Sequence, residues 1–212
     1  MKFCSESLLL YAVTDRKWLN GRTLLQQVSD AVDGGVTMVQ LREKNLDFDD
    51  FLNEAIEINK LCKSCSVPFI VNDNAEIALK SGADGVHLGQ NDEDVRTVRE
   101  KYGDRLIIGA TARTVEQAKA AQIDGADYLG VGAVFGTSTK ADAKPMTIAH
   151  LGEICSSVDI PVVAIGGING YNIIELKNSG AVGAAVVSAI FSADDTRTAA
   201  HELKIKAEKT FR

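Results

Sequence analysis

The sequence of 212 residues predicts an α/β protein, a single-domain (β/α)8 TIM barrel that spans residues 1–212. Three observations predict this fold. Short apolar segments alternate with amphipathic segments of helical length along the whole chain. The apolar segments are nearly continuous, as is typical of parallel strands that are buried on both faces. A weak internal repeat divides the chain into four similar parts, each long enough for two strand–helix units.

The expected elements follow one another in regular order. Eight apolar segments are the expected strands, at residues 8–14, 36–41, 68–71, 85–88, 106–110, 128–132, 162–165 and 184–188. Helical patterns lie between them at residues 24–32, 51–61, 95–101, 115–123, 148–155 and 173–178. Thr114 and Gln117 have the spacing of a capping box, in which the hydroxyl and the amide satisfy the free N–H groups at the start of a helix.

The repeat consists of a helix end, a glycine, a short loop and a strand, and it recurs at Gly34, Gly82, Gly125 and Gly180. We expect a left-handed glycine to end the helix in each copy. Four copies with two strands each give eight strands. The competing fold, an open doubly wound sheet, usually has fewer strands and a glycine-rich turn after the first strand. The segment 14–17 contains no glycine, so the barrel is favoured.

The net charge and the lengths of the apolar segments exclude several classes of function. The 23 Lys and Arg residues against 29 Asp and Glu residues give a formal net charge of −6, which disfavours nucleic acid or an acidic membrane surface as partner. No segment reaches the roughly 18 apolar residues of a membrane-spanning helix. The first apolar run is too short for a secretion signal, so we expect a cytoplasmic protein. The sequence leaves open whether the chain forms a homo-oligomer.

The four cysteines, Cys4, Cys62, Cys65 and Cys155, are expected to be free thiols in a reducing cytoplasm. Cys62 and Cys65 form a CxxC pattern, which is found in redox and zinc sites. This CxxC closes a helix instead of opening one, and no second cysteine pair completes a metal site. We therefore interpret it as structural.

The active site of such a barrel lies at the carboxyl ends of its strands. Polar and small residues gather at these ends: Gln40 to Lys44, Asn72 and Asp73, Asp92, Thr111, Thr137 to Lys140, Gly166 and Gly167, and Val187 and Ser188. The two glycines after the seventh strand and the serine after the eighth match the phosphate site of these barrels. Alternatively, the two glycines only form a tight turn and bind no phosphate.

Asp73 and Asp92 follow neighbouring strands and predict a Mg²⁺ site, because Mg²⁺ usually takes one or two protein carboxylates. Loop capping would explain the same residues, and their spacing alone does not decide. Arg42, Lys44 and Lys140 at the same rim favour the metal, since cations beside a metal suit a diphosphate substrate.

The polar loop over residues 137–145 is expected to act as a lid whose hydroxyls and lysine serve a second phosphate. No nucleophile elbow, HExxH or Walker pattern is present. His87 is expected to pack at the mouth or to orient a loop residue, and His150 and His201 to be solvated. The chemistry is therefore expected to depend on a leaving group and a metal rather than on an acid–base pair.

Several segments, taken in order, resemble the thiamine-phosphate synthase family over almost the whole chain. They are 11–15 (YAVTD), 40–44 (QLREK), 72–73 (ND), 87–92 (HLGQND), 137–140 (TSTK) and 165–168 (IGGI). Each segment alone is a weak pattern, whereas the ordered set is specific. The resemblance implies a (β/α)8 barrel that joins a pyrimidine diphosphate to a thiazole phosphate, giving thiamine monophosphate and pyrophosphate.

The resemblance also implies roles for individual residues. The pyrimidine diphosphate would be held by Gln40, Leu41, Arg42, Glu43, Lys44, Asn72, Thr111 and Lys140, and Mg²⁺ by Asp73 and Asp92. The thiazole phosphate would be held by Thr137, Ser138, Thr139, Gly166, Gly167, Val187 and Ser188. Arg42, Lys44, Lys140 and Thr111 are the expected catalytic residues. The small phosphorylated substrates are the only partners that the resemblance implies.

Two positions depart from the family pattern. Thr111-Ala112-Arg113 stands where Ser-x-His is common, and Gly136 stands where a proline is frequent. A thiazole tautomerase of the same fold is the nearest alternative, but that relative lacks the metal carboxylates and has a histidine at the position of Arg113. A non-catalytic barrel that binds thiazole phosphate and regulates a partner is the other alternative. Retention of Asp73 and Lys140 disfavours it.

Overall fold

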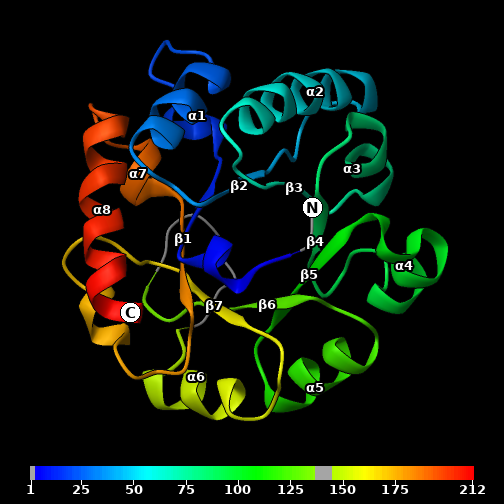
Figure 1. The fold of residues 1–212 in the computed structure, drawn as a ribbon, viewed down its shortest axis with the longest axis vertical. Coiled ribbons are helices and arrows are strands. Elements are labelled where there is room, and N and C mark those ends of the chain that lie inside the picture. The colour runs from blue at the N-terminus through cyan, green and yellow to red at the C-terminus, as the bar shows by residue number, and fades with distance from the viewer. Residues whose placement is uncertain (1–2, 137–144) are drawn as a thin grey trace.

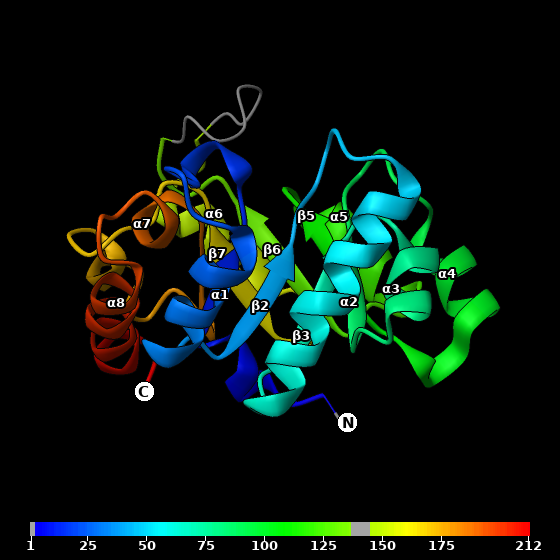
Figure 2. The same cartoon turned by 90° about the horizontal axis from the view of Figure 1, so that it is seen from above.

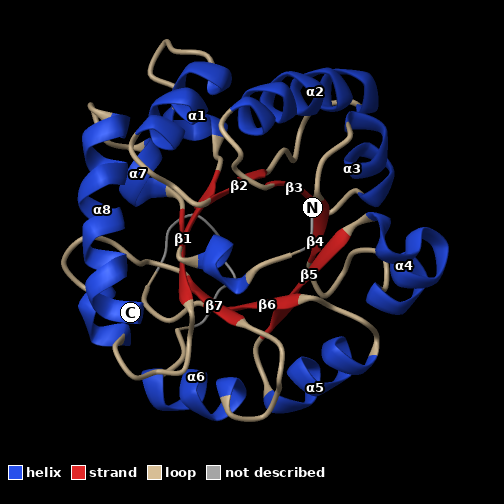
Figure 3. Ribbon diagram, viewed as in Figure 1, coloured by secondary structure: helices blue, strands red, loops and turns tan. Residues whose placement is uncertain are grey.

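The computed structural model describes residues 3–136 and 145–212. Eight parallel strands form a closed barrel in chain order, and β8 pairs with β1 to close it (Figures 1 and 3). The strands are β1 (Leu10–Val13), β2 (Met38–Leu41), β3 (Phe69–Asn72), β4 (Gly85–Leu88), β5 (Ile107–Ala112), β6 (Tyr128–Gly132), β7 (Val162–Ile165) and β8 (Gly183–Val186). The predicted (β/α)8 barrel is confirmed.

Helices form a ring outside the strands (Figure 3). They are α1 (Leu24–Asp33), α2 (Phe48–Ser64), α3 (Ala75–Ser81), α4 (Val95–Tyr102), α5 (Val115–Ile123), α6 (Ile148–Cys155), α7 (Ser188–Phe191) and α8 (Thr196–Phe211). Short 3-10 turns are η1 (Ser5–Leu8), η2 (Arg16–Trp18), η3 (Gly103–Arg105) and η4 (Ile173–Leu176). In Figure 2 both termini lie at the end of the barrel where the strands begin. No helix in the described ranges is long and apolar enough to cross a membrane.

The barrel separates two apolar cores. Side chains inside the barrel form the smaller core, which includes Tyr11, Met38, Ile70, Tyr128 and Val163. The larger core fills the layer between the strands and the helices. Neighbouring residues of one strand alternate between the two cores, because successive side chains of a strand point to opposite faces. Apart from half-buried residues near the pocket, both faces of the strands are thus buried, which explains the continuous apolar runs in the sequence.

The glycine repeat precedes β2, β4, β6 and β8, as the sequence predicts for a barrel of four strand pairs. Gly82, Gly125 and Gly180 have positive φ angles of 72°, 98° and 86°. The first copy differs from the prediction, because Gly34 has a φ of −75° and ends the helix in right-handed conformation. Gly35, with a φ of 99°, is the left-handed residue there.

The first three copies of the repeat also share a hydrogen-bonded clamp. The clamp is made by the residue immediately before β2, β4 or β6. This residue donates its backbone N–H to a carbonyl of the strand before it, and its side chain accepts a backbone N–H from the same strand. Thr37 is so paired with Leu10, Asp84 with Phe69, and Asp127 with Ile108. The fourth copy has Val182 at this position, and only the backbone bond to Val162 remains.

Some expected elements differ in the structure. Leu8 belongs to η1, so β1 is shorter than expected, and the helix expected over 173–178 is only the 3-10 turn η4. β8 ends at Val186, and Ser188 begins α7. The helices α3 and α8 add to those expected. Thr114 caps α5 as predicted, but the Gln117 side-chain oxygen accepts the N–H of Arg113, one residue before the cap.

Candidate active site

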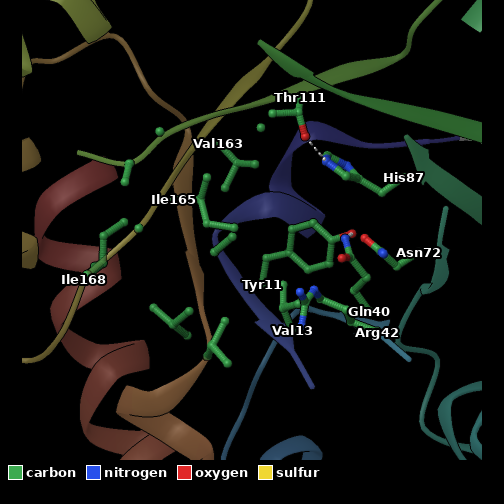
Figure 4. Close-up of a pocket in the computed structure, with 18 of the residues that line it drawn as sticks. Tyr11, Val13, Gln40, Arg42, Asn72, His87, Thr111, Val163, Ile165 and Ile168 are labelled. Atoms are coloured by element: carbon green, nitrogen blue, oxygen red, sulfur yellow. Dashed lines mark hydrogen bonds between the residues drawn. The ribbon is translucent and has the colours of Figure 1, made fainter. Parts of the chain in front are cut away.

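A pocket opens at the carboxyl ends of the strands, and all eight strands or their following loops contribute to its wall (Figure 4). The wall has two unlike halves. The strands β2 to β5 contribute the polar residues Gln40, Arg42, Asn72, His87, Thr111 and Arg113. The strands β7 and β8 with their loops contribute mostly apolar and small residues: Val163, Ile165, Gly166, Gly167, Ile168, Ala185, Val186, Val187 and Ser188. A ligand in this pocket therefore meets hydrogen-bonding groups on one side and apolar surface on the other.

The structure brings most of the predicted site residues to this pocket. Those that line it are Gln40, Arg42, Asn72, Thr111, Gly166, Gly167, Val187 and Ser188. Leu41, Glu43, Lys44, Asp73 and Asp92 are not among its lining residues. Thr137, Ser138, Thr139 and Lys140, together with the expected lid loop up to residue 144, lie outside the described residues.

The segment after β2 turns its side chains alternately toward and away from the pocket. Leu41 is fully buried in the core between barrel and helices. Glu43 points to Arg16, whose Nε lies 2.9 Å from the carboxylate, and Arg16 also contacts Glu54 on α2. Burial raises the pKa of Glu43 to about 7, against the opposing effect of Arg16. Leu41 and Glu43 therefore anchor the segment that presents Arg42 to the pocket.

Asp73 and Asp92 are neighbours at the ends of β3 and β4. Lys44 forms an ion pair with Asp73. Asp92 accepts the N–H of Gly89 at 2.6 Å, and its pKa is raised by burial and by the adjacent Asp73 carboxylate. Two carboxylates that repel each other across a narrow gap have more negative charge than one lysine neutralises. This arrangement fits a divalent cation.

The donor set also indicates which cation fits. Among the described residues, no cluster of three or more His, Cys, Asp or Glu side chains could hold a metal ion. A cation at Asp73 and Asp92 would thus take only two protein carboxylates and complete its shell with water or substrate oxygens. Mg²⁺ is bound in this way, because it dehydrates reluctantly and usually keeps several waters.

The loop after β7 approaches other backbone so closely that only glycine fits. Gly166 and Gly167 have φ angles of 103° and 67°. A Cβ on Gly167 would lie 2.3 Å from the carbonyl oxygen of Gly136. The amide of Asn172 donates to the Gly167 carbonyl at 3.0 Å and holds the turn. The turn lies beside Val187 and Ser188 in the pocket wall, so backbone and hydroxyl donors are available for an anion on that side.

A chain of hydrogen bonds along the pocket wall was not expected from the sequence. The Gln40 amide nitrogen lies 2.7 Å from the Tyr11 hydroxyl, which lies 2.8 Å from the hydroxyl of Tyr128. Tyr128 lies 3.1 Å from Nδ1 of His87, and Nε2 of His87 lies 3.1 Å from the Thr111 hydroxyl. Figure 4 shows the last of these bonds. Burial raises the pKa of both tyrosines, so both remain protonated hydroxyls.

The structure also bears on the expectations for His150 and for the CxxC pattern at Cys62. His150 is not simply solvated, because its Nε2 lies 3.1 Å from the Arg113 carbonyl oxygen and its Nδ1 lies 3.0 Å from Glu153. It thereby ties α6 to the loop after β5. Cys62 is buried and unpaired, and burial raises the pKa of its thiol to about 12. Such a thiol is a poor nucleophile, in agreement with a structural CxxC.

Comparison with known proteins identifies close relatives. The chain matches a family model described as thiamine monophosphate synthase over residues 10–190. It is 50% identical over 188 residues to the thiamine-phosphate synthase of Clostridioides difficile, with 89% of this chain and 90% of that protein covered. It is 49% identical over 194 residues to the thiamine-phosphate synthase of Ruminiclostridium cellulolyticum, with 92% of both proteins covered.

A solved structure shows the same relationship in three dimensions. The thiamine phosphate pyrophosphorylase from Pyrococcus furiosus superposes on this chain with a TM-score of 0.91. The two are 38% identical in sequence, and the superposition covers 98% of this chain and 99% of the other. The similarity therefore extends over the barrel and its surrounding helices together.

Proposed function

The chain belongs to the thiamine monophosphate synthase family, and from this premise we propose how its residues divide the work of the reaction. It is a transferase of thiamine biosynthesis. It condenses 4-amino-2-methyl-5-(diphosphooxymethyl)pyrimidine with thiazole phosphate, and the products are thiamine monophosphate and pyrophosphate. The observation that carries the assignment of roles is the division of the pocket into a cationic, carboxylate-flanked half and an apolar half.

In our proposal the polar half binds the pyrimidine diphosphate. Gln40, Asn72 and Thr111 line this half with amide and hydroxyl groups that suit a polar heteroaromatic ring. Arg42 lines it with a guanidinium group, which binds phosphate through two parallel hydrogen bonds. Lys44 and Lys140 add charge to the same substrate group, while Leu41 and Glu43 support the segment that carries Arg42.

Asp73 and Asp92 are the proposed ligands of Mg²⁺, because they are adjacent and share an excess of negative charge. When bound there, the ion would supply positive charge to the diphosphate as it leaves. Lys44 contacts Asp73 and would lie next to the same diphosphate. Its ammonium group therefore links the carboxylate pair to the cationic rim.

The thiazole phosphate is proposed to bind the other half of the pocket. Gly166, Gly167, Val187 and Ser188 provide backbone and hydroxyl donors for its phosphate, and the adjacent apolar wall accommodates its ring. The resemblance to the family adds Thr137, Ser138 and Thr139 to this group. The two substrates would then face each other across the pocket, with the thiazole nitrogen directed at the pyrimidine methylene.

The reaction needs no protein nucleophile. The C–O bond at the pyrimidine methylene breaks, and the bonding electron pair leaves with the pyrophosphate. The thiazole nitrogen then donates its lone pair to the electron-poor methylene carbon. Arg42, Lys44 and Lys140 stabilise the charge that grows on the leaving group, and Thr111 holds the diphosphate or the ring in place. The four free thiols favour a reducing compartment, and we propose that the enzyme works in the cytoplasm on these small molecules.

A one-pot assay tests the proposal. Purified protein is mixed with both substrates and Mg²⁺, and thiamine monophosphate is measured as thiochrome fluorescence with and without EDTA. Product that disappears with EDTA supports the synthase and its metal. If no product forms while calorimetry shows that thiazole phosphate binds, the protein is instead a thiazole tautomerase or a regulatory barrel of the same fold.

A further inference from the structure

The hydrogen-bonded chain from Gln40 to Thr111 crosses the inside of the barrel and returns to the pocket. Its two ends line the pocket wall on β2 and β5. Its middle consists of Tyr11 on β1, Tyr128 on β6 and His87 on β4. Both tyrosines are buried in the inner core. Tyr11 and His87 also line the pocket, so the chain connects the Gln40 and Thr111 parts of the binding surface along its floor and through the buried hydroxyl of Tyr128.

Two glycines make room for this chain. A Cβ on Gly109 would lie 2.2 Å from the ring of Tyr128, and a Cβ on Gly130 would lie 3.0 Å from the ring of His87. Tyr128 is also held by Phe3, whose ring stacks on it with the centroids 5.6 Å apart. Tyr128 and His87 thus occupy positions that the neighbouring strands leave open for them.

The orientation of the Gln40 amide sets the direction in which each group of the chain donates. The Gln40 amide donates to the oxygen of Tyr11, and the single proton of Tyr11 is then directed at Tyr128. The proton of Tyr128 is in turn directed at Nδ1 of His87. A ring nitrogen that accepts carries no proton, so the proton of His87 is on Nε2 and is donated to Thr111.

The last bond determines what Thr111 offers to a ligand. Because its oxygen accepts from His87, its own proton is directed away from His87 and can be donated within the pocket that it lines. Rotating the Gln40 amide by half a turn would reverse every bond of the chain. Thr111 would then donate to His87 and would present only an acceptor to the ligand.

We propose that Tyr11, Tyr128 and His87 are positioning residues that couple the orientation of the Gln40 amide to the donor state of the Thr111 hydroxyl. The inference rests on the function proposed above, in which both ends of the chain contact the pyrimidine diphosphate. A substrate that fits the forward direction of the chain is bound at both ends together. A ligand that needs the opposite pattern at either end must reverse five groups at once.

The central variant to test is Tyr128→Phe, which keeps the ring and removes the hydroxyl that joins the two halves of the chain. We expect kcat/KM for the pyrimidine diphosphate to fall about five- to tenfold, as for the loss of one or two hydrogen bonds. The KM for thiazole phosphate should not change. Tyr102→Phe is the matched control, because Tyr102 is a buried tyrosine on α4 outside the pocket and should leave both constants unchanged.

A double-mutant cycle separates coupling from simple structural damage. In a Thr111→Val background the chain has no hydroxyl left to orient, so Tyr128→Phe should cause less than about a twofold further loss. Independent effects that multiply would overturn the proposal. If Tyr128→Phe does not fold, Tyr11→Phe cuts the chain one bond earlier and is tested in the same cycle.

Nitrogen NMR of histidine-labelled protein tests the direction without any activity. The resonances of His87 are assigned by their loss in His87→Gln. We expect the proton on Nε2 in the wild type, and a rise in the Nδ1-protonated tautomer when Tyr128→Phe removes the donor to Nδ1. A wild-type proton on Nδ1 would overturn the proposal. Because this measurement needs no substrate, it remains decisive if the assay finds no synthase activity.

Discussion

At the scale of single residues, packing inside the barrel places a large side chain beside a glycine. Tyr128 reaches across the inner core toward Tyr11 because Gly109, on the adjacent strand β5, has no side chain. In a closed barrel the inner volume is fixed by the strands, so a large residue on one strand requires a small one opposite it. The glycine is therefore a packing requirement and not a turn.

Gly109→Ala tests this requirement. The new Cβ would lie 2.2 Å from the Tyr128 ring, so the ring or the strand must move. Overpacking of a dense core costs about 1–3 kcal/mol, and we expect a loss of stability in this range by urea unfolding. Gly152→Ala is the matched control, because Gly152 lies in α6 with its nearest contact 3.5 Å away. The control should be neutral or slightly stabilising, and an equal loss in both variants would contradict the argument.

The carboxylate pair leads to a prediction about metal dependence. Asp92→Asn removes one of two proposed ligands while keeping an acceptor for the Gly89 N–H. Mutating a residue that only hydrogen-bonds a metal ligand lowers metal affinity about 10- to 100-fold. Loss of a ligand itself should cost no less, so the Mg²⁺ concentration for half-maximal rate should rise at least about tenfold. Asp94→Asn is the control, since Asp94 only caps α4 through the N–H groups of Arg96 and Thr97. Equal Mg²⁺ titrations for both variants would refute the metal assignment.

The sequence predicts much of the rim at this scale but not the floor of the pocket. Gln40, Asn72 and Ser188 are polar residues at strand ends, so their place in the pocket follows once the barrel is expected. Tyr11 and Tyr128 lie within apolar strands that are buried on both faces. Because both faces of such strands are apolar, the sequence shows no alternation of polar and apolar residues. Which side chains point into the barrel therefore becomes clear only in the structure.

At the scale of elements, the clamps at the start of the odd strands repeat along the chain. Asp127 accepts the N–H of Ile108 at 2.7 Å and pairs with Arg99 at 2.7 Å. Asp84 accepts the N–H of Phe69 at 2.9 Å and forms no ion pair with a residue that the structure describes. Each carboxylate satisfies a backbone donor that the strand ladder leaves unpaired. These clamps lie at the end of the barrel opposite the pocket, where residues serve stability.

Replacement of these carboxylates should destabilise the barrel to different degrees. Leaving a buried donor unsatisfied costs about 1–3 kcal/mol, so Asp84→Ala should lose this much in urea unfolding. Asp127→Ala should lose more, because its ion pair with Arg99 is lost as well. Asp127→Asn keeps an acceptor and should recover part of the loss. Activity per folded molecule should be unchanged, and an equal loss for both alanine variants would argue against the role of Arg99.

The sequence predicts best those helices that are long and amphipathic or that begin with a clear capping residue. The amphipathic helices α1 and α2 are long enough to show their period in the sequence. The start of α5 is instead marked by its Thr114 cap. The helix expected over 173–178 is only the 3-10 turn η4, which packs against α8. The turn ends because Lys177, with a ψ of 132°, leaves the helical conformation. α3 has only seven residues, too few for a clear helical period, although Asn74 caps it.

At the scale of the whole molecule, the Arg16, Glu43 and Glu54 cluster joins three elements beside the site. Arg16 on η2 contacts Glu43 after β2 and Glu54 on α2. One guanidinium thus faces two carboxylates, and the buried one is the more costly to ionise. Burial, then Glu54, raises the pKa of Glu43 from 4.5 to about 7, although Arg16 acts in the opposite direction. Folding therefore favours the protonated form of Glu43.

This shift makes stability depend on pH with a definite sign. Between pH 4.5 and about 7 the folded protein holds more protons on Glu43 than the unfolded chain does. The free energy of unfolding therefore falls as pH rises through this window, and it levels off above it. Glu43→Gln has no proton to lose and removes this dependence.

Urea unfolding of wild type and Glu43→Gln at pH 5, 6, 7 and 8 measures the difference. We expect the stability of the variant relative to wild type to increase from pH 5 to about 7 and then to stay constant. Subtracting the two proteins cancels the titration of the other acidic side chains, which are common to both. A difference that is flat, or that decreases with pH, would mean that Arg16 keeps Glu43 ionised throughout. The cluster would then act as a permanent ion pair that fixes the segment carrying Arg42.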